Sequence, residues 1–184
     1  GAKIVAVTSG GRLGSLASSN GNILFSIPEG FPPRASMPYL LVPVISVLSK
    51  LFPEAGLAGQ LDESISVLEQ MAGDLGPGKP QAVNAAKKIA GSLIGRIPYI
   101  FGSHGGSDAA AYRWKCQISE NSKMNSCHNV FPELDHNEIV NLAGKGSKDI
   151  FVVLLRDGDE SDKMKKRIDV TRKIIESSTA GVAE

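Results

Sequence analysis

A polar segment at residues 120–138 contains the side-chain types that enzymes use for proton transfer. Its sequence, ENSKMNSCHNVFPELDHNE, places the carboxylate of Glu120 and the imidazole of His136 sixteen residues apart. A glutamate can remove a proton beside a carbonyl if its pKa rises toward neutrality, and an imidazole exchanges protons near neutral pH. We interpret the segment as a loop that brings a base and an acid to one small substrate.

Arg34 is a candidate for the positive charge that such a reaction needs. Pro32 and Pro33 stiffen the backbone before it and place it at the start of an apolar helix. An arginine is permanently charged and binds phosphate or enediolate oxygens through two parallel hydrogen bonds. Facing the other two groups, Arg34 would stabilise a developing oxyanion.

Each of these residues also has a purely structural interpretation. Glu120 would then be the solvent-facing end of a helix, and His136 would cap the start of the next one. Arg34 would pair with Glu29 on the surface. A short group of polar residues is a weak indicator of a site, so the residue types by themselves leave both interpretations open.

Two glycine-rich turns each follow a predicted strand and precede a helix. They are TSGGRLGSLA at 8–17 and GSHGGSDAAAYRWK at 102–115, and neither is a GxGxxG fingerprint or a P-loop. The spacing in the first favours an ordinary tight turn, although such turns can present N–H groups to an anion. In the second, an ordinary helix cap competes with a crevice lined by four polar residues: Ser103, His104, Ser107 and Asp108.

Strands and helices alternate along the chain. Apolar runs predict strands at 3–7, 23–27, 97–102 and 150–155, with a further strand beginning after the glycine near the end. Helical spacing predicts helices at 36–52, 62–71, 81–94, 137–142 and 161–176, and one more after the glycine turn at 102–106. This alternation predicts an α/β fold, a doubly wound parallel sheet flanked by helices, with a linker at 73–80.

The composition is that of an ordinary globular protein and excludes several classes. The 184 residues are 42% hydrophobic and 21% charged, with a formal net charge of +1, so no basic surface for nucleic acid or acidic membranes is expected. The apolar run at 39–51 is interrupted and too short to span a bilayer. The two cysteines, Cys116 and Cys127, lack the spacing of a zinc site, and we expect a reduced, cytoplasmic protein.

Both ends of the chain are interpreted as interrupted. The first predicted strand suits the centre of a parallel sheet, which leaves its neighbours unaccounted for. At the other end, STAGVAE breaks a helix and begins another strand. We therefore expect the sequence to be part of a longer chain.

The polar segment resembles the bifunctional phosphoglucose/phosphomannose isomerases of archaea and bacteria. The stretch SENSKMNSCHNVFPELDHNEIVN is similar to that family's Glu-Asn-x-Lys segment, which is followed by Pro-Glu-x-x-His-Asn. VTSGGRL and PPRAS are similar to two other blocks of the family, in the same order. The resemblance covers nearly the whole chain.

This resemblance implies paired sugar isomerase (SIS) domains with flavodoxin-like sheets. Residues 1–58 would be the C-terminal tail of a first SIS domain, and 59–184 a second one truncated at its C-terminus. Glu120 would be the base, His136 the ring-opening acid and base, and Arg34 the residue that steadies the intermediate. The reaction would interconvert glucose 6-phosphate, and mannose 6-phosphate, with fructose 6-phosphate through a cis-enediol, without metal or cofactor. The family is dimeric, so a homodimer is expected, with His136 supplied by the neighbouring subunit.

Two departures from the family pattern bear on activity. The family's phosphate-binding loops precede the first strand of this chain, and its C-terminal lysine lies beyond Glu184. We therefore expect the 184 residues alone to be inactive or very weak. The alternative function is a non-catalytic sugar-phosphate-binding SIS domain that regulates transcription, and an interaction protein without a ligand ranks third. The presence of both Glu120 and His136 favours the enzyme.

Overall fold

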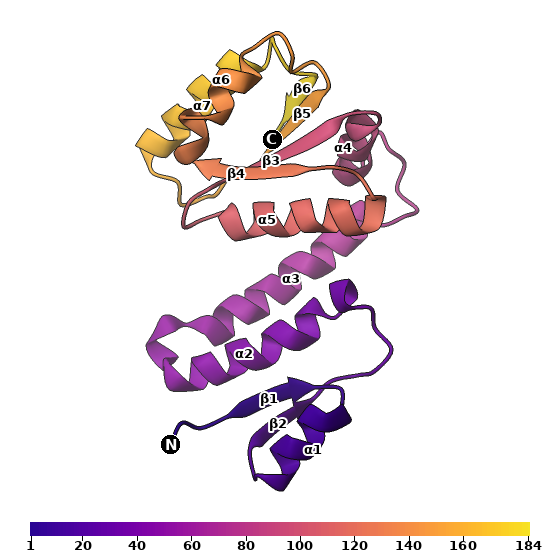
Figure 1. The fold of residues 1–184 in the computed structure, drawn as a ribbon, viewed down its shortest axis with the longest axis vertical. Helices are drawn as coiled ribbons and strands as arrows, with labels where there is room; N and C mark the ends of the chain where they lie inside the picture. The colour runs from indigo at the N-terminus through magenta and orange to yellow at the C-terminus, as the bar shows by residue number, and fades with distance from the viewer. The chain divides into compact units, whose positions relative to one another are not determined.

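The computed structural model describes residues 1–184, which form two compact units, Gly1–Gly76 and Pro77–Glu184 (Figure 1). The boundary between the units lies in the glycine- and proline-rich segment predicted as a linker, 73–80. The expected domain boundary at residue 58 instead falls at the start of helix α3, Leu57–Leu75, inside the first unit. The assignment of SIS domains to these parts remains a prediction.

The first unit is built on two parallel strands. These are β1, Val5–Thr8, and β2, Ile23–Ser26, joined by helix α1, Gly11–Ser19. A one-turn helix, Pro33–Ala35, precedes α2, Met37–Leu51, and a second, Pro53–Ala55, precedes α3. Side chains alternate along β1, so Val5 and Val7 line a cavity with α2 while Thr8 contacts Gly14 of α1.

Helix α2 is apolar and α3 carries apolar side chains among four acidic ones, yet neither helix contains a buried residue. Pro38 lies in the first turn of α2, and Pro43 lies inside the same helix. Helix α3 is longer than the predicted 62–71, so Asp62 lies within it and is not its cap. None of the helices by itself combines the length and the apolar composition of a membrane span. Helix α2 and the segment Pro53–Leu75 reach that length and composition only when taken together, and they are bent by 115° at the break between them.

The second unit is a four-stranded parallel sheet with helices on both faces. Its strands are β3, Ile97–Ser103, β4, Cys127–Phe131, β5, Ile150–Leu154, and β6, Gly181–Ala183, in the order β4-β3-β5-β6. Its helices are α4, Ala85–Leu93, α5, Asp108–Gln117, α6, Glu138–Leu142, and α7, Asp162–Ile175. A π-helical turn, Ile118–Ser122, follows α5, and a 3-10 turn, Glu133–Asp135, follows β4. The predicted α/β fold is confirmed.

Two hydrophobic layers hold this sheet in place. On the side of α6 and α7 (Figure 1), Phe101, Leu154 and Ile168 are part of one buried cluster. On the side of α4 and α5, Leu93, Ile100 and Ala111 are part of the other. Every residue of β5 is buried, as expected for a central strand covered on both faces.

Strand β4 was not predicted, because the sequence analysis interpreted residues 120–138 as a loop. Only Val130 and Phe131 of CHNVF are strongly apolar, so the segment lacks the usual pattern of a strand. Pairing with β3 imposes the strand instead, with Tyr99 opposite Cys127 and Ser103 opposite Phe131. As the outer strand of the sheet, β4 tolerates polar side chains that a central strand would not.

Candidate active site

Glu120 lies in the π-helical turn that links α5 to β4. The preceding Ile118 is buried in the core, whereas the Glu120 side chain is exposed. Lys123 adopts a left-handed backbone conformation (φ 56°) just after the turn, and its ammonium donates to the Glu120 carbonyl at 2.6 Å. π-Helical turns are rare and frequently occur at functional sites, which marks this position as a candidate.

A pair of serines closes the turn that carries Glu120. The hydroxyls of Ser119 and Ser126 lie 3.1 Å apart, on either side of the exposed residues between them. The Ser126 hydroxyl also donates to the carbonyl of Lys115 in α5, at 3.1 Å. These bonds tie the segment back to the helix and restrict the position from which Glu120 can act.

His136 follows the 3-10 turn at the opposite end of β4. Leu134 of this turn is fully buried, while His136 itself is exposed. The His136 amide donates to the carbonyl of Glu133 at 2.9 Å. His136 does not lie at the cap position of α6, which Asn137 occupies.

The expectation that one loop brings Glu120 and His136 together is wrong within a single chain. Strand β4 separates them, and α5 and β4 run in opposite directions (Figure 1). Glu120 therefore precedes the amino end of β4, and His136 follows its carboxyl end. The five residues of β4 span about 16 Å at roughly 3.3 Å per residue. The two residues thus flank opposite ends of strand β4.

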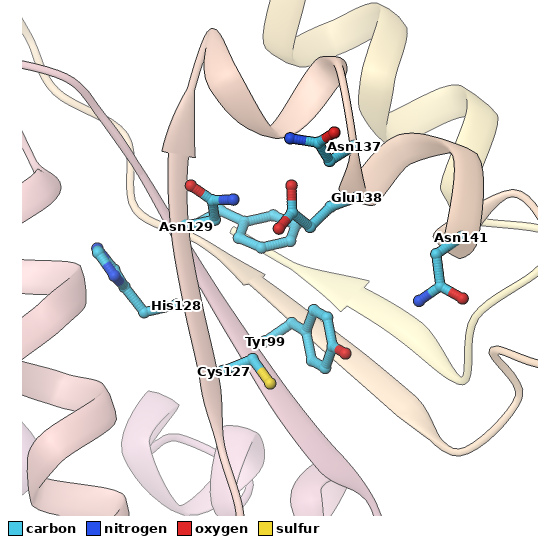
Figure 2. Close-up of a pocket in the computed structure, with 8 residues that line it drawn as sticks. Tyr99, Cys127, His128, Asn129, Asn137, Glu138 and Asn141 are labelled. Atoms are coloured by element: carbon cyan, nitrogen blue, oxygen red, sulfur yellow. The ribbon is translucent and has the colours of Figure 1, made fainter.

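Arg34 belongs to the first unit and lies in the one-turn helix Pro33–Ala35, where its side chain is exposed. The two prolines before it set the backbone of this turn. The backbone N–H of Ser36 closes the turn by donating a hydrogen bond to the Pro33 carbonyl. Neither Arg34 nor Glu120 nor His136 lines the cavity shown in Figure 2.

That cavity lies over β3 and β4, beside α6, and has a volume of about 390 Å³. In Figure 2 the side chains of Asn129, Asn137 and Glu138 converge, whereas His128 points to the other side of β4. There the His128 ring contacts that of Tyr112, with the ring centres 5.5 Å apart. The lining contains no lysine or arginine, so it offers no cation to a phosphate group.

Tyr99 is the titratable group of this cavity with a displaced pKa. Burial raises the pKa of its phenol to about 12, and the hydrogen bond to Cys127 and the negative charge of Glu138 act in the same direction. The phenol therefore remains neutral, and a donor, throughout the physiological range.

A second crevice of about 200 Å³ lies at the carboxyl ends of β3 and β5. From β3 the chain continues to β4 on one side, and from β5 it continues to β6 on the other side, which leaves a crevice between the two connections. Ligands of open parallel sheets often bind in such a crevice. Ser103 and His104 line the crevice as considered, together with Asp157, Asp159 and Glu160. The three carboxylates disfavour a phosphate ligand there.

Ser107 and Asp108 do not line this crevice and instead organise the loop beneath it. The Ser107 hydroxyl donates to the carbonyl of Leu155 at 2.6 Å and accepts from the amide of Ser103. The Asp108 carboxylate accepts from the amides of Gly105 and Ala109, which lowers its pKa. Ser107 occupies the N-cap position of α5, as the capping interpretation expected, but its side chain makes no capping hydrogen bond.

Sequence reasoning missed the residues that hold the candidate catalytic groups. Ser126 bonds back to the preceding helix α5, and Asp135 bonds to α7, thirty-six residues further along the chain. In the separate cavity, Tyr99 and Glu138 come together only in the folded chain. None of these residues belongs to a short motif. The nearest signal for Ser126, Asp135 and Glu138 was their position within the polar segment at 120–138, whereas Tyr99 had no such signal.

Comparison with known proteins places this geometry in a family. A model of the bacterial phospho-glucose isomerase C-terminal SIS domain matches residues 82–184. The chain is 36% identical over 184 residues to a bifunctional phosphoglucose/phosphomannose isomerase of Caldicellulosiruptor bescii, covering 99% of this chain and 54% of the relative. It is also 36% identical over 183 residues to the protein of that name in Thermoplasma acidophilum, covering 97% and 52%. The chain thus spans about half the length of these curated relatives.

A solved structure agrees with the fold. A glucose-6-phosphate isomerase like protein from Thermus thermophilus superposes with a TM-score of 0.56 and 20% identity, covering 73% of this chain and 45% of that one. The resemblance inferred from the polar segment is therefore confirmed: the chain belongs to the bacterial phospho-glucose isomerase family and carries its C-terminal SIS domain.

Proposed function

We propose that the chain is the part of a sugar-phosphate isomerase that carries its base and its ring-opening residue. The reaction interconverts glucose 6-phosphate or mannose 6-phosphate with fructose 6-phosphate. Family membership supports this proposal, as do the names of the relatives. The observation that carries it is the exposed Glu120 on a braced π-helical turn, a position from which a carboxylate can reach a substrate.

The chemistry begins with ring opening. His136 donates a proton to the ring oxygen as the bond from that oxygen to the anomeric carbon breaks, and the anomeric hydroxyl gives up its proton to water, which yields the open-chain sugar. Glu120 then removes the proton from the carbon beside the carbonyl, and the electron pair moves onto the carbonyl oxygen to form a cis-enediolate. Arg34 stabilises the negative charge that develops on this oxygen. A proton then passes from the neighbouring hydroxyl to that oxygen, and Glu120 returns its proton to the former carbonyl carbon, which completes the aldose–ketose conversion.

The enediol explains how one site handles two aldoses. Glucose 6-phosphate and mannose 6-phosphate differ only in the configuration at carbon 2, and that carbon becomes planar in the enediol. Both sugars therefore lead to the same intermediate. Proton return to either face of carbon 2 gives one aldose or the other.

We further propose that the chain acts as a homodimer whose active site is shared. The separation of Glu120 and His136 by β4 supports this arrangement, because a sugar phosphate is too short to contact residues at both ends of this strand. In a two-fold symmetric dimer, Glu120 of one subunit can meet His136 of the other, and the site occurs twice.

The phosphate is held outside the two crevices described, since neither has a basic lining. We propose that the other half of the relatives' length supplies this contact, so the 184 residues alone should be inactive or very weak.

Activity is to be measured in a chain of the relatives' full length that contains these residues, here called the extended chain. We expect it to work in the cytoplasm, where its two free thiols remain reduced.

A coupled assay with fructose 6-phosphate tests the role of Glu120. Glu120→Gln removes the base while keeping the side-chain size, so we expect activity to fall by about three orders of magnitude or more with the fold intact. Glu176→Gln is the matched control, because Glu176 is an exposed carboxylate at the end of α7. Equal activity in Glu120→Gln and wild type would remove Glu120 from the mechanism. Sugar-phosphate binding without activity in wild type would favour a regulatory SIS domain.

A further inference from the structure

The turn that carries His136 is fastened to the rest of the second unit at two points. Leu134 is fully buried in the core cluster beneath α6 and α7. Asp135, the next residue, reaches α7 through its carboxylate, which is 14% exposed. The remaining hydrogen bonds of the turn are internal, since both the His136 amide and the Asn137 side chain bond to Glu133.

Asp135 makes two contacts with α7, one through each carboxylate oxygen. The hydroxyl of Thr171 donates to Oδ1 at 2.7 Å, and a guanidinium nitrogen of Arg167 donates to Oδ2 at 3.0 Å. Arg167 and Thr171 are four residues apart, so they lie on the same face of the helix. Together these three residues form a contact that we call the α7 clamp.

The two halves of the α7 clamp differ in strength. Thr171 is 2% exposed, so its bond to the carboxylate is shielded from water. The Arg167 side chain is 47% exposed, and an ion pair with an exposed partner contributes little. The Thr171 hydroxyl is therefore the main contact that prevents the turn from rotating about its Leu134 anchor.

We propose that Asp135, Thr171 and Arg167 are positioning residues that hold His136 in the orientation needed for ring opening. The proposal rests on the proposed function, because it assigns a purpose to the contact only if His136 opens the sugar ring. His136 is exposed and directly follows Asp135, so rotation of the turn displaces its imidazole. A displacement of about 1 Å at a reacting group can lower a rate by about a hundredfold.

The variants separate the clamp from general stability. Thr171→Val removes the hydroxyl at nearly constant shape, and Thr171→Ser restores it. Thr179→Val is the matched control, because Thr179 is also buried and its hydroxyl bonds only to the Ile175 carbonyl of its own segment. Should Thr171→Val fail to fold, Asp135→Ala removes the clamp from the side of the turn.

The readout is the rate at which the extended chain exchanges the α and β anomers of glucose 6-phosphate, followed by exchange NMR. Anomer exchange requires ring opening and closing but no proton transfer at carbon, so it reports His136 separately from Glu120. We expect Thr171→Val to lower this rate about tenfold or more while the KM for fructose 6-phosphate changes less than about twofold. Thr171→Ser should keep at least about half the wild-type rate, and Thr179→Val should match wild type.

Two results would overturn the clamp while leaving the proposed function in place. One is a wild-type rate of anomer exchange in Thr171→Val, and the other is an equal loss in Thr171→Val and Thr179→Val. Glu120→Gln should retain anomer exchange while losing isomerisation, which shows that the two steps are measured independently. If the wild-type extended chain neither exchanges anomers nor isomerises fructose 6-phosphate, the proposed function fails and the clamp proposal fails with it.

Discussion

Glu120 and His136 share a mode of support: each is exposed, and each follows a residue anchored in the core. Ile118 anchors the turn of Glu120, and Leu134 anchors the turn of His136. Side-chain hydrogen bonds then fix the turns, through Ser126 in one case and Asp135 in the other. In the proposed mechanism such support would limit the motion of both side chains before substrate arrives, which is the basis of preorganised catalysis.

The raised pKa of Tyr99 predicts how the free energy of unfolding changes with pH. Its phenol has a folded-state pKa of about 12 against an ordinary value of 10.0, so the unfolded chain loses this proton first as the pH rises. Tyr99 therefore contributes stability that is complete below about pH 10 and is lost as the pH rises through about 12. We expect urea unfolding of Tyr99→Phe to show a shallower decline over this window than wild type. Parallel declines would contradict the pKa assignment.

At the scale of elements, the apolar runs predicted β1, β2, β3 and β5, and the spacing of apolar residues predicted α4 and α7. Buried positions set the pattern of β3, β5 and α7, whereas β2 contains no buried residue and is visible only as an apolar run. Strand β4 and the π-helical turn could not be predicted, because β4 is polar and owes its conformation to pairing with β3. The ends of α3 were missed because its exposed surface imposes no strict periodicity.

The same distinction applies to the candidate site. The polar segment indicated Glu120 and His136 through a family resemblance, whereas the contacts that hold them are long-range. Asp135 and Thr171 are separated by thirty-six residues. The polar segment suggested one loop between the two candidate residues, and only the strand pairing shows that they flank opposite ends of β4.

Amide hydrogen exchange of the second unit tests strand β4. An outer strand is bonded on one side only, so we expect the amides of 127–131 that bond to β3 to be protected and the outward ones to exchange fast. The central strand β5 serves as the internal reference, and its amides should be the slowest. Uniformly fast exchange across 127–131 would show that this segment is a loop, as its composition suggested.

At the scale of the whole molecule, the proposed activity requires more protein than one chain of 184 residues. The relatives are about twice as long, and α2 and α3 carry exposed apolar side chains with no buried residue. Extended apolar surfaces of this kind mark places where protein packs on protein. In the proposed shared site, the separation of Glu120 from His136 by β4 would likewise require a second subunit to bring the two groups together.

Mixed dimers of two inactive variants test the shared site most directly. Glu120→Gln and His136→Gln extended chains would be produced together, and their isomerase activity compared with that of each variant alone. In a shared two-fold site, random assembly makes about half of the dimers mixed, and each of these has one site with native Glu120 and native His136. We predict recovery of about a quarter of wild-type activity. If mixing leaves the activity at the level of the single variants, both groups act from the same chain, and the proposed arrangement is wrong.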